Sequence, residues 1–162
     1  MRPKHSGFTL IELMIVVVLI AIIATVAVPG FTSMIESNRF KGATNNVIGL
    51  LNFARSEAVR KGQYVVVGPN GSGWQEGMLV YQEGENPSAP GFVPLRLLEE
   101  MPGSVTLELA SGSPPRFTGT GKQHSFGVSE FRLCPGNGEP GVLIVVNGGG
   151  QTFRRETPAS CP

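Results

Sequence analysis

A long apolar run near the amino terminus constrains this chain more than any other feature. The residues from Phe8 to Val28 are almost all hydrophobic, and Arg2 and Lys4 precede them. About 20 apolar residues are enough for one helix to cross a bilayer. Basic residues before such a helix hold a short amino terminus in the cytoplasm, so the sequence predicts that the rest of the chain lies on the far side of the membrane.

A charged residue inside this run, Glu12, separates two interpretations. A secretory signal peptide also has a basic start and an apolar core, and the small residues 24–27 can serve as its cleavage site. An unpaired carboxylate in apolar surroundings is costly, so a plain signal or anchor gains nothing from Glu12. The sequence therefore predicts that this carboxylate has a partner and a role.

The residues around Glu12 resemble the cleavage and assembly segment of type IV pilins and type II secretion pseudopilins. The resemblance rests on Gly-Phe-Thr-Leu-Ile-Glu at residues 7–12, followed by the apolar residues 13–18. It implies that a prepilin peptidase cuts after Gly7 and N-methylates Phe8, and that Glu12 pairs with the amino terminus of a neighbouring subunit. The new ammonium group and Glu12 lie one helical turn apart, so in staggered subunits each can neutralise the other.

The same resemblance implies an α+β, type IV pilin-like fold, in which a long N-terminal helix with a transmembrane first half packs on a C-terminal β-rich head. Pro29 matches a position where the family often has a helix-kinking proline. We expect a leader peptide at 1–7, a transmembrane and filament-core helix at 8–29, an amphipathic half of the helix at 30–62 and the head at 63–162. Apolar residues at three- or four-residue steps predict the amphipathic half, and Gly62 its end: Phe40, Val47, Leu51, Ala54 and Ala58.

The remainder of the chain has the pattern of short strands bounded by Gly, Pro, Asn or Ser. The predicted strands are Tyr64–Val67, Met78–Tyr81, Val105–Leu109, Phe131–Cys134 and Val142–Val146. The segment Leu95–Met101 fits either a strand or a helical turn, and Gln82–Phe92 is predicted to be an exposed loop.

A second resemblance, to the GspH/FimT group, narrows the family. Residues 51–62 resemble the end of that group's helix, and residues 73–78 and 142–150 resemble its Gly-Trp segment and its last long strand and turn. This implies a minor pilin of a type IV pilus that supports assembly or priming, and so motility, adhesion or DNA uptake. A type II secretion pseudopilin is the alternative. The implied partners are other pilins or pseudopilins, prepilin peptidase and the inner membrane, with the amino terminus cytoplasmic and the head periplasmic before incorporation into a pilus or pseudopilus.

Composition argues against an enzyme. All acidic residues are Glu, and His124 is the one histidine outside the expected leader. No serine lies in Gly-x-Ser-x-Gly, and no Lys-Ser/Thr follows Gly148–Gly150, which we interpret as a turn. We therefore expect no catalytic residues, metal or cofactor.

Four further residues are given structural interpretations. We interpret Arg55, Glu57 and Arg60 as partners of head loops or of a neighbouring subunit, and Trp74 as a core or edge anchor.

The two cysteines, Cys134 and Cys161, lie far apart and lack the spacing of a zinc site. In an extracytoplasmic protein an even pair predicts a disulfide, and two free buried thiols are the alternative.

The last basic segment raises the question of nucleic acid. Some FimT-like proteins bind DNA through a basic C-terminal stretch, but Gln151 stands here where the first arginine of that pattern is expected. Phe153, Arg154 and Arg155 can still offer a stacking surface and phosphate contacts. Two arginines give a weak attraction that falls with salt, and the net charge of +1 loses two positive charges with the leader. A DNA receptor at a pilus tip is thus an alternative function, and nucleic acid is not the favoured partner.

Overall fold

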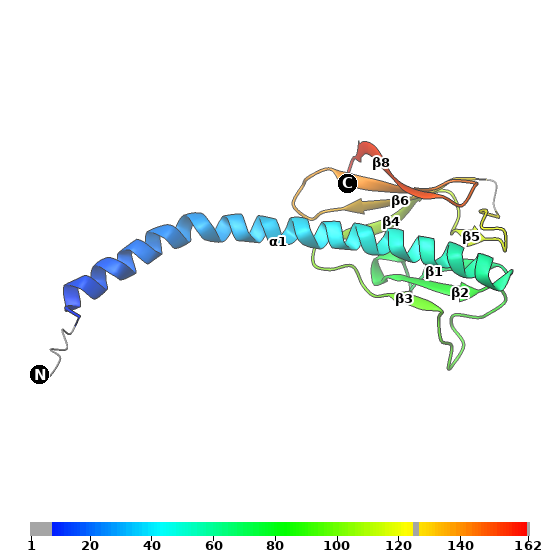
Figure 1. Ribbon diagram of the computed structural model, residues 1–162, viewed down its shortest axis with the longest axis horizontal. Helices are drawn as coiled ribbons and strands as arrows, with labels where there is room; N and C mark the ends of the chain where they lie inside the picture. The colour runs from blue at the N-terminus through cyan, green and yellow to red at the C-terminus, as the bar shows by residue number, and fades with distance from the viewer. Residues whose placement is uncertain (1–7, 125–126, 162) are drawn as a thin grey trace, which may run out of the picture. The chain divides into compact units, whose positions relative to one another are not determined.

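The computed structural model describes residues 8–124 and 127–161, and only the backbone at residues 26, 28, 29 and 156–159. The leader residue Gly7 lies outside this range. The chain divides into two compact units, Met1–Ser37 and Asn38–Pro162, which are described separately. The helix α1, Leu10–Lys61, contributes to both units (Figure 1).

The first unit consists of the amino-terminal part of α1. Its large hydrophobic side chains are exposed, and an 18-residue window with a mean hydropathy of 3.0 is long and apolar enough to cross a membrane. Two hydroxyl groups within it are satisfied by the helix itself: the Thr25 hydroxyl donates to the Ile22 carbonyl at 2.7 Å, and the Ser33 hydroxyl to the Gly30 carbonyl at 3.0 Å. Satisfying polar groups within one helix is what an apolar environment requires.

The second unit is the head together with the carboxyl-terminal half of α1. This half of the helix is amphipathic as expected, because Val47, Leu51, Ala54 and Ala58 are fully buried and Phe40 packs against the same core. The helix ends at Lys61. Gly62 adopts a φ of +65°, and the amides of Gly62 and Gln63 donate to the carbonyls of Val59 and Ala58. This is a Schellman cap, which needs a residue that tolerates the left-handed region.

Two antiparallel four-stranded sheets make up the rest of the head (Figure 1). The first has the order β3-β2-β1-β5 and the second β4-β6-β7-β8. The strands of the first sheet are β1 Val65–Pro69, β2 Met78–Gln82, β3 Arg96–Leu98 and β5 Arg116–Phe117. Those of the second are β4 Thr106–Ser111, β6 Ser129–Cys134, β7 Gly141–Val146 and β8 Thr152–Ala159.

The five predicted strands are confirmed, each within two residues at either end. The ambiguous segment Leu95–Met101 contains the short strand β3, and Gln82–Phe92 falls largely between β2 and β3, where its residues after Gln82 are mostly exposed. Two strands were not predicted, the two-residue β5 and the eight-residue β8. β8 lacks the sequence pattern of a strand because residues 154–156 are charged and residue 158 is proline. These residues are tolerated because β8 is an edge strand.

One core joins the helix to both sheets. It contains Leu50 and Leu51 of α1, strand residues such as Val80 of the first sheet, and Phe131 and Ile144 of the second. Trp74 belongs to a short 3-10 helix, η1 (Trp74–Glu76), and meets the ring of Phe131 edge-on with the centroids 4.9 Å apart, so the anchor role expected for Trp74 is confirmed. In the view of Figure 1, β2 and β3 of the first sheet lie on one side of the carboxyl-terminal half of α1, and β4, β6 and β8 of the second sheet lie on the other.

Candidate functional site

The first turn of α1 carries the residues that the sequence assigns to processing and assembly. The Thr9 hydroxyl accepts a hydrogen bond from the Glu12 amide at 3.3 Å, and the Thr9 carbonyl accepts one from the Leu13 amide at 3.2 Å. Thr9 is therefore the cap of the helix, and Glu12 occupies the third helical position. Thr-x-x-Glu is the spacing of a capping box, a signal in the sequence that our prediction did not use.

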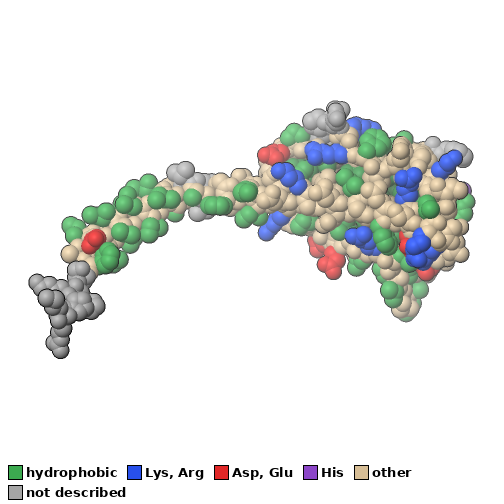
Figure 2. Space-filling model, viewed as in Figure 1, with side chains coloured by type: hydrophobic (Ala, Val, Ile, Leu, Met, Phe, Trp, Pro, Cys, Tyr) green, Lys and Arg blue, Asp and Glu red, His purple; other side chains and the backbone are tan. Residues whose placement is uncertain are grey.

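The surroundings of Glu12 are apolar and open. Its neighbours Leu10, Ile11 and Leu13 are each more than half exposed, and Phe8 is 80% exposed. Figure 2 shows hydrophobic side chains along the visible face of this part of the helix. A carboxylate on such a surface stays solvated only while the surface is bare. An unpaired carboxylate would be costly to bury if such a surface were covered.

The other expected features of the helix are placed as follows. The helix runs through Pro29 without a break in its assignment, and the kink expected there stays a prediction.

The carboxylate of Glu57 is paired within the helix. The residue is 8% exposed and accepts a hydrogen bond from the Arg60 Nε at 2.9 Å, and the Lys61 ammonium group lies 3.4 Å away. The Arg60 guanidinium holds the pKa of Glu57 below its usual value, against a smaller opposing effect of burial.

Arg55 contacts loops of the head, which is one of the two roles expected for it; the other was contact with a neighbouring subunit. Its Nε donates to the carbonyl of Gly121 at 2.9 Å, and its Nη2 lies 3.5 Å from the carbonyl of Gly149. Gly121 lies between β5 and β6, and Gly149 lies in the turn that joins β7 to β8. The helix thus binds both the connection between the two sheets and a turn of the second sheet, which sequence reasoning did not foresee in this detail.

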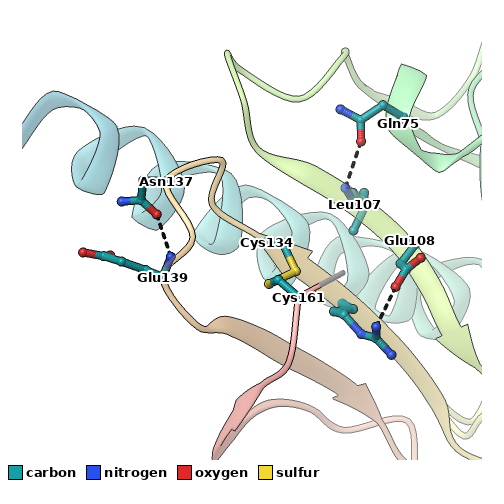
Figure 3. The surroundings of a disulfide bond; sticks show 8 residues. Gln75, Leu107, Glu108, Cys134, Asn137, Glu139 and Cys161 are labelled. Carbon is teal, nitrogen blue, oxygen red and sulfur yellow. Dashed lines mark hydrogen bonds and ion pairs between the residues drawn. A yellow bond between two sulfur atoms is a disulfide. The ribbon is translucent and has the colours of Figure 1, made fainter. Parts of the chain in front are cut away.

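The disulfide Cys134–Cys161 is present, so the expected pairing is confirmed and the alternative of two free thiols is wrong (Figure 3). Cys134 is the last residue of β6, and Cys161 follows the end of β8. The Cα atoms are 5.7 Å apart. In Figure 3 the loop with Asn137 and Glu139 lies near the bond, where the Asn137 side chain accepts from the Glu139 amide at 3.1 Å.

The three residues considered for DNA contact lie on β8 but do not converge. Phe153 pairs with Val145 and is 45% exposed, and Arg155 forms an ion pair across β7 with Glu130 on β6. Arg154 lies between them in the strand, so its side chain points to the opposite face of the sheet. A stacking ring and two free guanidinium groups are therefore not presented together on one face.

Gln151 closes the turn before β8 through hydrogen bonds with Asn147. Its side-chain oxygen accepts from the Asn147 Nδ2 at 3.1 Å, and its amide donates to the Asn147 Oδ1 at 3.0 Å. The turn interpretation of Gly148–Gly150 is confirmed, because the turn connects β7 to β8. Gly150 adopts a φ of +75°, and a Cβ there would lie 2.0 Å from the Gly121 carbonyl oxygen.

Among the described residues, no group of three or more His, Cys, Asp or Glu side chains is placed to hold a metal ion. The open hollow beside the disulfide, about 590 Å³ in volume, is lined mainly by Pro, Gly and Ser residues between 104 and 161.

Comparison with known proteins agrees with this geometry. The profile of the GspH family, described as type II transport protein GspH, matches residues 43–150 of this 162-residue chain. The chain belongs to the GspH family. A second profile, the prokaryotic N-terminal methylation motif, matches residues 2–28. This GspH-family protein is therefore a pilin-class structural subunit and not an enzyme, and its methylation motif marks it for prepilin peptidase and assembly with other pilins.

Individual relatives resemble parts of this GspH-family chain. The type IV major pilin protein PilA of Myxococcus xanthus is 39% identical over 63 residues, which cover 39% of this chain and only 29% of that pilin. Two crystal structures of the type IV minor pilin FimU of Pseudomonas aeruginosa share the fold, with TM-scores of 0.66 and 0.61 at 20% and 22% identity. They cover 78% and 75% of this chain and 98% and 99% of their own. The head and its helix thus have the pilin fold.

Proposed function

We propose that this GspH-family protein is a minor pilin that is cut after Gly7, N-methylated at Phe8 and incorporated into a type IV pilus. The observation that carries the proposal is the first turn of α1, where a single carboxylate, Glu12, lies within an exposed apolar surface. Such a surface is stable either in a bilayer or in a bundle of similar helices. The carboxylate of Glu12 decides which of these two environments is favoured. Pairing with the Phe8 ammonium group of a neighbour favours the bundle.

In this proposal the amino terminus starts in the cytoplasm and the head in the periplasm. The apolar half of α1 leaves the inner membrane when the neighbouring subunit supplies its cation, and the disulfide-closed head then lies at the filament surface. The subunit supports pilus assembly or priming, and through the pilus motility, adhesion or DNA uptake.

The second candidate is a type II secretion pseudopilin, which is favoured by the description of the family that matches residues 43–150. The assembly chemistry of the two candidates is the same, because both use the amino-terminal segment. They differ in the machine that the filament serves, so an experiment on the cell separates them better than one on the isolated protein.

The test is deletion of the gene in its own organism, with complementation by an epitope-tagged full chain. We expect the tagged protein in sheared surface pili, together with fewer pili and reduced twitching in the deletion strain. A deletion strain that keeps normal piliation but retains secreted proteins in the periplasm would replace the pilus proposal with the pseudopilin. A strain with normal piliation and normal secretion would refute both.

A further inference from the structure

One side chain of η1 occupies part of the open edge of β4. β4 stands at one end of the second sheet and pairs there with β6. On its other side, the Gln75 Nε2 donates to the Val105 carbonyl at 3.0 Å, and the Gln75 Oε1 accepts from the Leu107 amide at 2.9 Å. Figure 3 shows the bond to Leu107. Gln75 therefore reaches from the connection between β1 and β2 to the edge of the other sheet.

These two bonds are the ones that a neighbouring strand would make. A side-chain amide carries the same donor and acceptor as a backbone peptide group. Along a β-strand the backbone groups of successive residues point to alternate sides, so the groups that face one neighbour recur at every second residue. Val105 and Leu107 are two residues apart, and their outward groups therefore bind Gln75 as they would bind a strand.

The short helix η1 is held against both sheets. On the second sheet, the Trp74 ring meets the ring of Phe131 edge-on with the centroids 4.9 Å apart. On the first sheet, Gly77 directly follows η1 with a φ of +116°, and a Cβ there would lie 2.1 Å from the Leu98 carbonyl oxygen of β3. Gly77 thus lets the backbone after η1 pass close against β3. Gln75 lies between these two contacts, so the fold positions it on both sides.

The strand β4 is an edge that needs protection. It has six residues, against three in β3 and two in β5, and exposed strand edges are templates for pairing with another chain. At its far end the register with β6 shifts between Leu109 and Ser111, and such irregularities interrupt regular pairing. At its start the register is regular, and Gln75 covers the backbone instead.

We propose that Gln75 is a clamp between the two sheets. Its amide takes the place of a strand at the start of β4 and holds η1 on the second sheet. While the clamp is formed, the Val105 carbonyl and the Leu107 amide are not available to a strand of another chain. The clamp belongs to the head itself, so it is independent of whether the subunit serves a pilus or a secretion machine.

The first test is hydrogen–deuterium exchange of single amides, measured by NMR on the full chain in detergent micelles. Gln75→Met keeps the length of the side chain but removes its donor and acceptor, and it should fold because Gln75 is exposed. We expect the Leu107 amide to exchange at least about tenfold faster than in the wild type. The amides of Thr106 and Glu108, which face β6, are the internal reference and should not change.

Two matched variants separate the clamp from a general loss of stability. Gln75→Glu keeps an oxygen that accepts from the Leu107 amide, so exchange at Leu107 should stay within about twofold of the wild type. Gln63→Met removes an exposed amide side chain just after the end of α1 and should change nothing at Leu107. Unchanged exchange at Leu107 in Gln75→Met overturns the proposal. Equal acceleration of Leu107, Thr106 and Glu108 also overturns it, as does the same acceleration in Gln75→Glu as in Gln75→Met.

The second test examines whether the clamp holds η1 in place. Trp74 is the one tryptophan of the chain, so its fluorescence reports on η1. We expect acrylamide to quench this fluorescence more strongly in Gln75→Met than in the wild type or in Gln63→Met, because η1 then moves away from Phe131 more often. Equal quenching in all three chains would show that η1 stays on the second sheet without the amide of Gln75, and the clamp would be refuted.

Discussion

Arg55 of α1 donates through its Nε to the backbone carbonyl of Gly121 at a distance of 2.9 Å. The two residues are 66 positions apart in the chain, and the same guanidinium group reaches Gly149, a further loop residue. This contact attaches the carboxyl-terminal half of α1 to the connection between the two sheets and to a turn of the second sheet.

Replacing Arg55 tests this attachment. Arg55→Ala leaves two loop carbonyls without their charged donor, so we expect a loss of about 2 kcal/mol in the free energy of unfolding, measured by urea denaturation of the full chain in detergent. Arg55→Lys should recover little, because an ammonium group lacks the planar fork that reaches two carbonyls. Arg39→Ala, at an exposed position of the same helix, is the control. A loss at Arg55 no larger than this control would contradict the attachment.

The close packing of Gly150 gives a second prediction. Gly150→Ala places a Cβ 2.0 Å from the Gly121 carbonyl oxygen at a φ of +75°, so the turn before β8 must shift. We expect destabilisation of more than about 2 kcal/mol in the same assay. Gly73→Ala is the matched control, because Gly73 has an extended φ of −171° and no atom within 4 Å of an added Cβ. Equal effects of the two substitutions would show that Gly150 is not sterically required.

The ion pair of Glu57 predicts a dependence of stability on pH. Because Arg60 lowers the pKa of Glu57 in the folded state, the stabilisation is present above the unfolded pKa of about 4.3 and is lost as the pH falls through the folded value. Glu57→Gln should therefore be less stable than the wild type at neutral pH, and the two curves should approach each other in acid. Unfolding free energies measured across this range check the prediction, and a constant difference down to the lowest pH would contradict it.

Assembly gives a prediction that separates Glu12 from the cleavage site. Glu12→Ala should leave processing intact but remove the chain from sheared filaments, because no carboxylate remains to neutralise the neighbouring Phe8 ammonium group. Immunoblots of cell and sheared fractions measure both steps. Glu12→Gln keeps the size of the side chain and most of the helix-capping capacity, so it should fail in the same way. Wild-type incorporation of either variant would count against the pairing.

Substitution of Gly7 by a bulky residue is the complementary experiment. It should leave an uncut precursor of higher mass in the membrane fraction. Normal maturation on a gel would remove the basis of the processing proposal, whatever the outcome at Glu12.

For DNA we expect little binding. Arg155 is paired with Glu130, and Arg154 lies on the other face of β8 from Phe153, so a gel-shift assay at physiological salt should show little retardation. The control for charge alone is Arg39→Ala/Lys41→Ala on the helix. Tight binding that Arg154→Ala/Arg155→Ala abolishes, and that the helix variant leaves intact, would establish the pilus-tip receptor instead.

The contrast between β7 and β8 shows how far sequence reasoning reached in the head. β7 was predicted because a run of aliphatic residues between Gly and Asn is typical of a buried strand. β8 was missed because its charges and its proline are acceptable only at an edge, and edge position is a property of the assembled sheet. The same holds for Arg55, whose helix position was visible but whose partners are loops that lie 66 and 94 residues away.

The sequence by itself determined the class of the protein, because the signals for it are local. The apolar run from Phe8, the carboxylate at Glu12 and the apolar stripe up to Ala58 depend only on neighbouring residues and on helical periodicity. Only the tertiary structure decided that Arg155 forms an ion pair with Glu130 and that Gln151 closes a turn. It also decided that the two disulfide sulfurs lie close to Gly141. The ion pair and the disulfide join residues 25 and 27 positions apart in the chain, and their geometry exists only once the sheets have packed around one core.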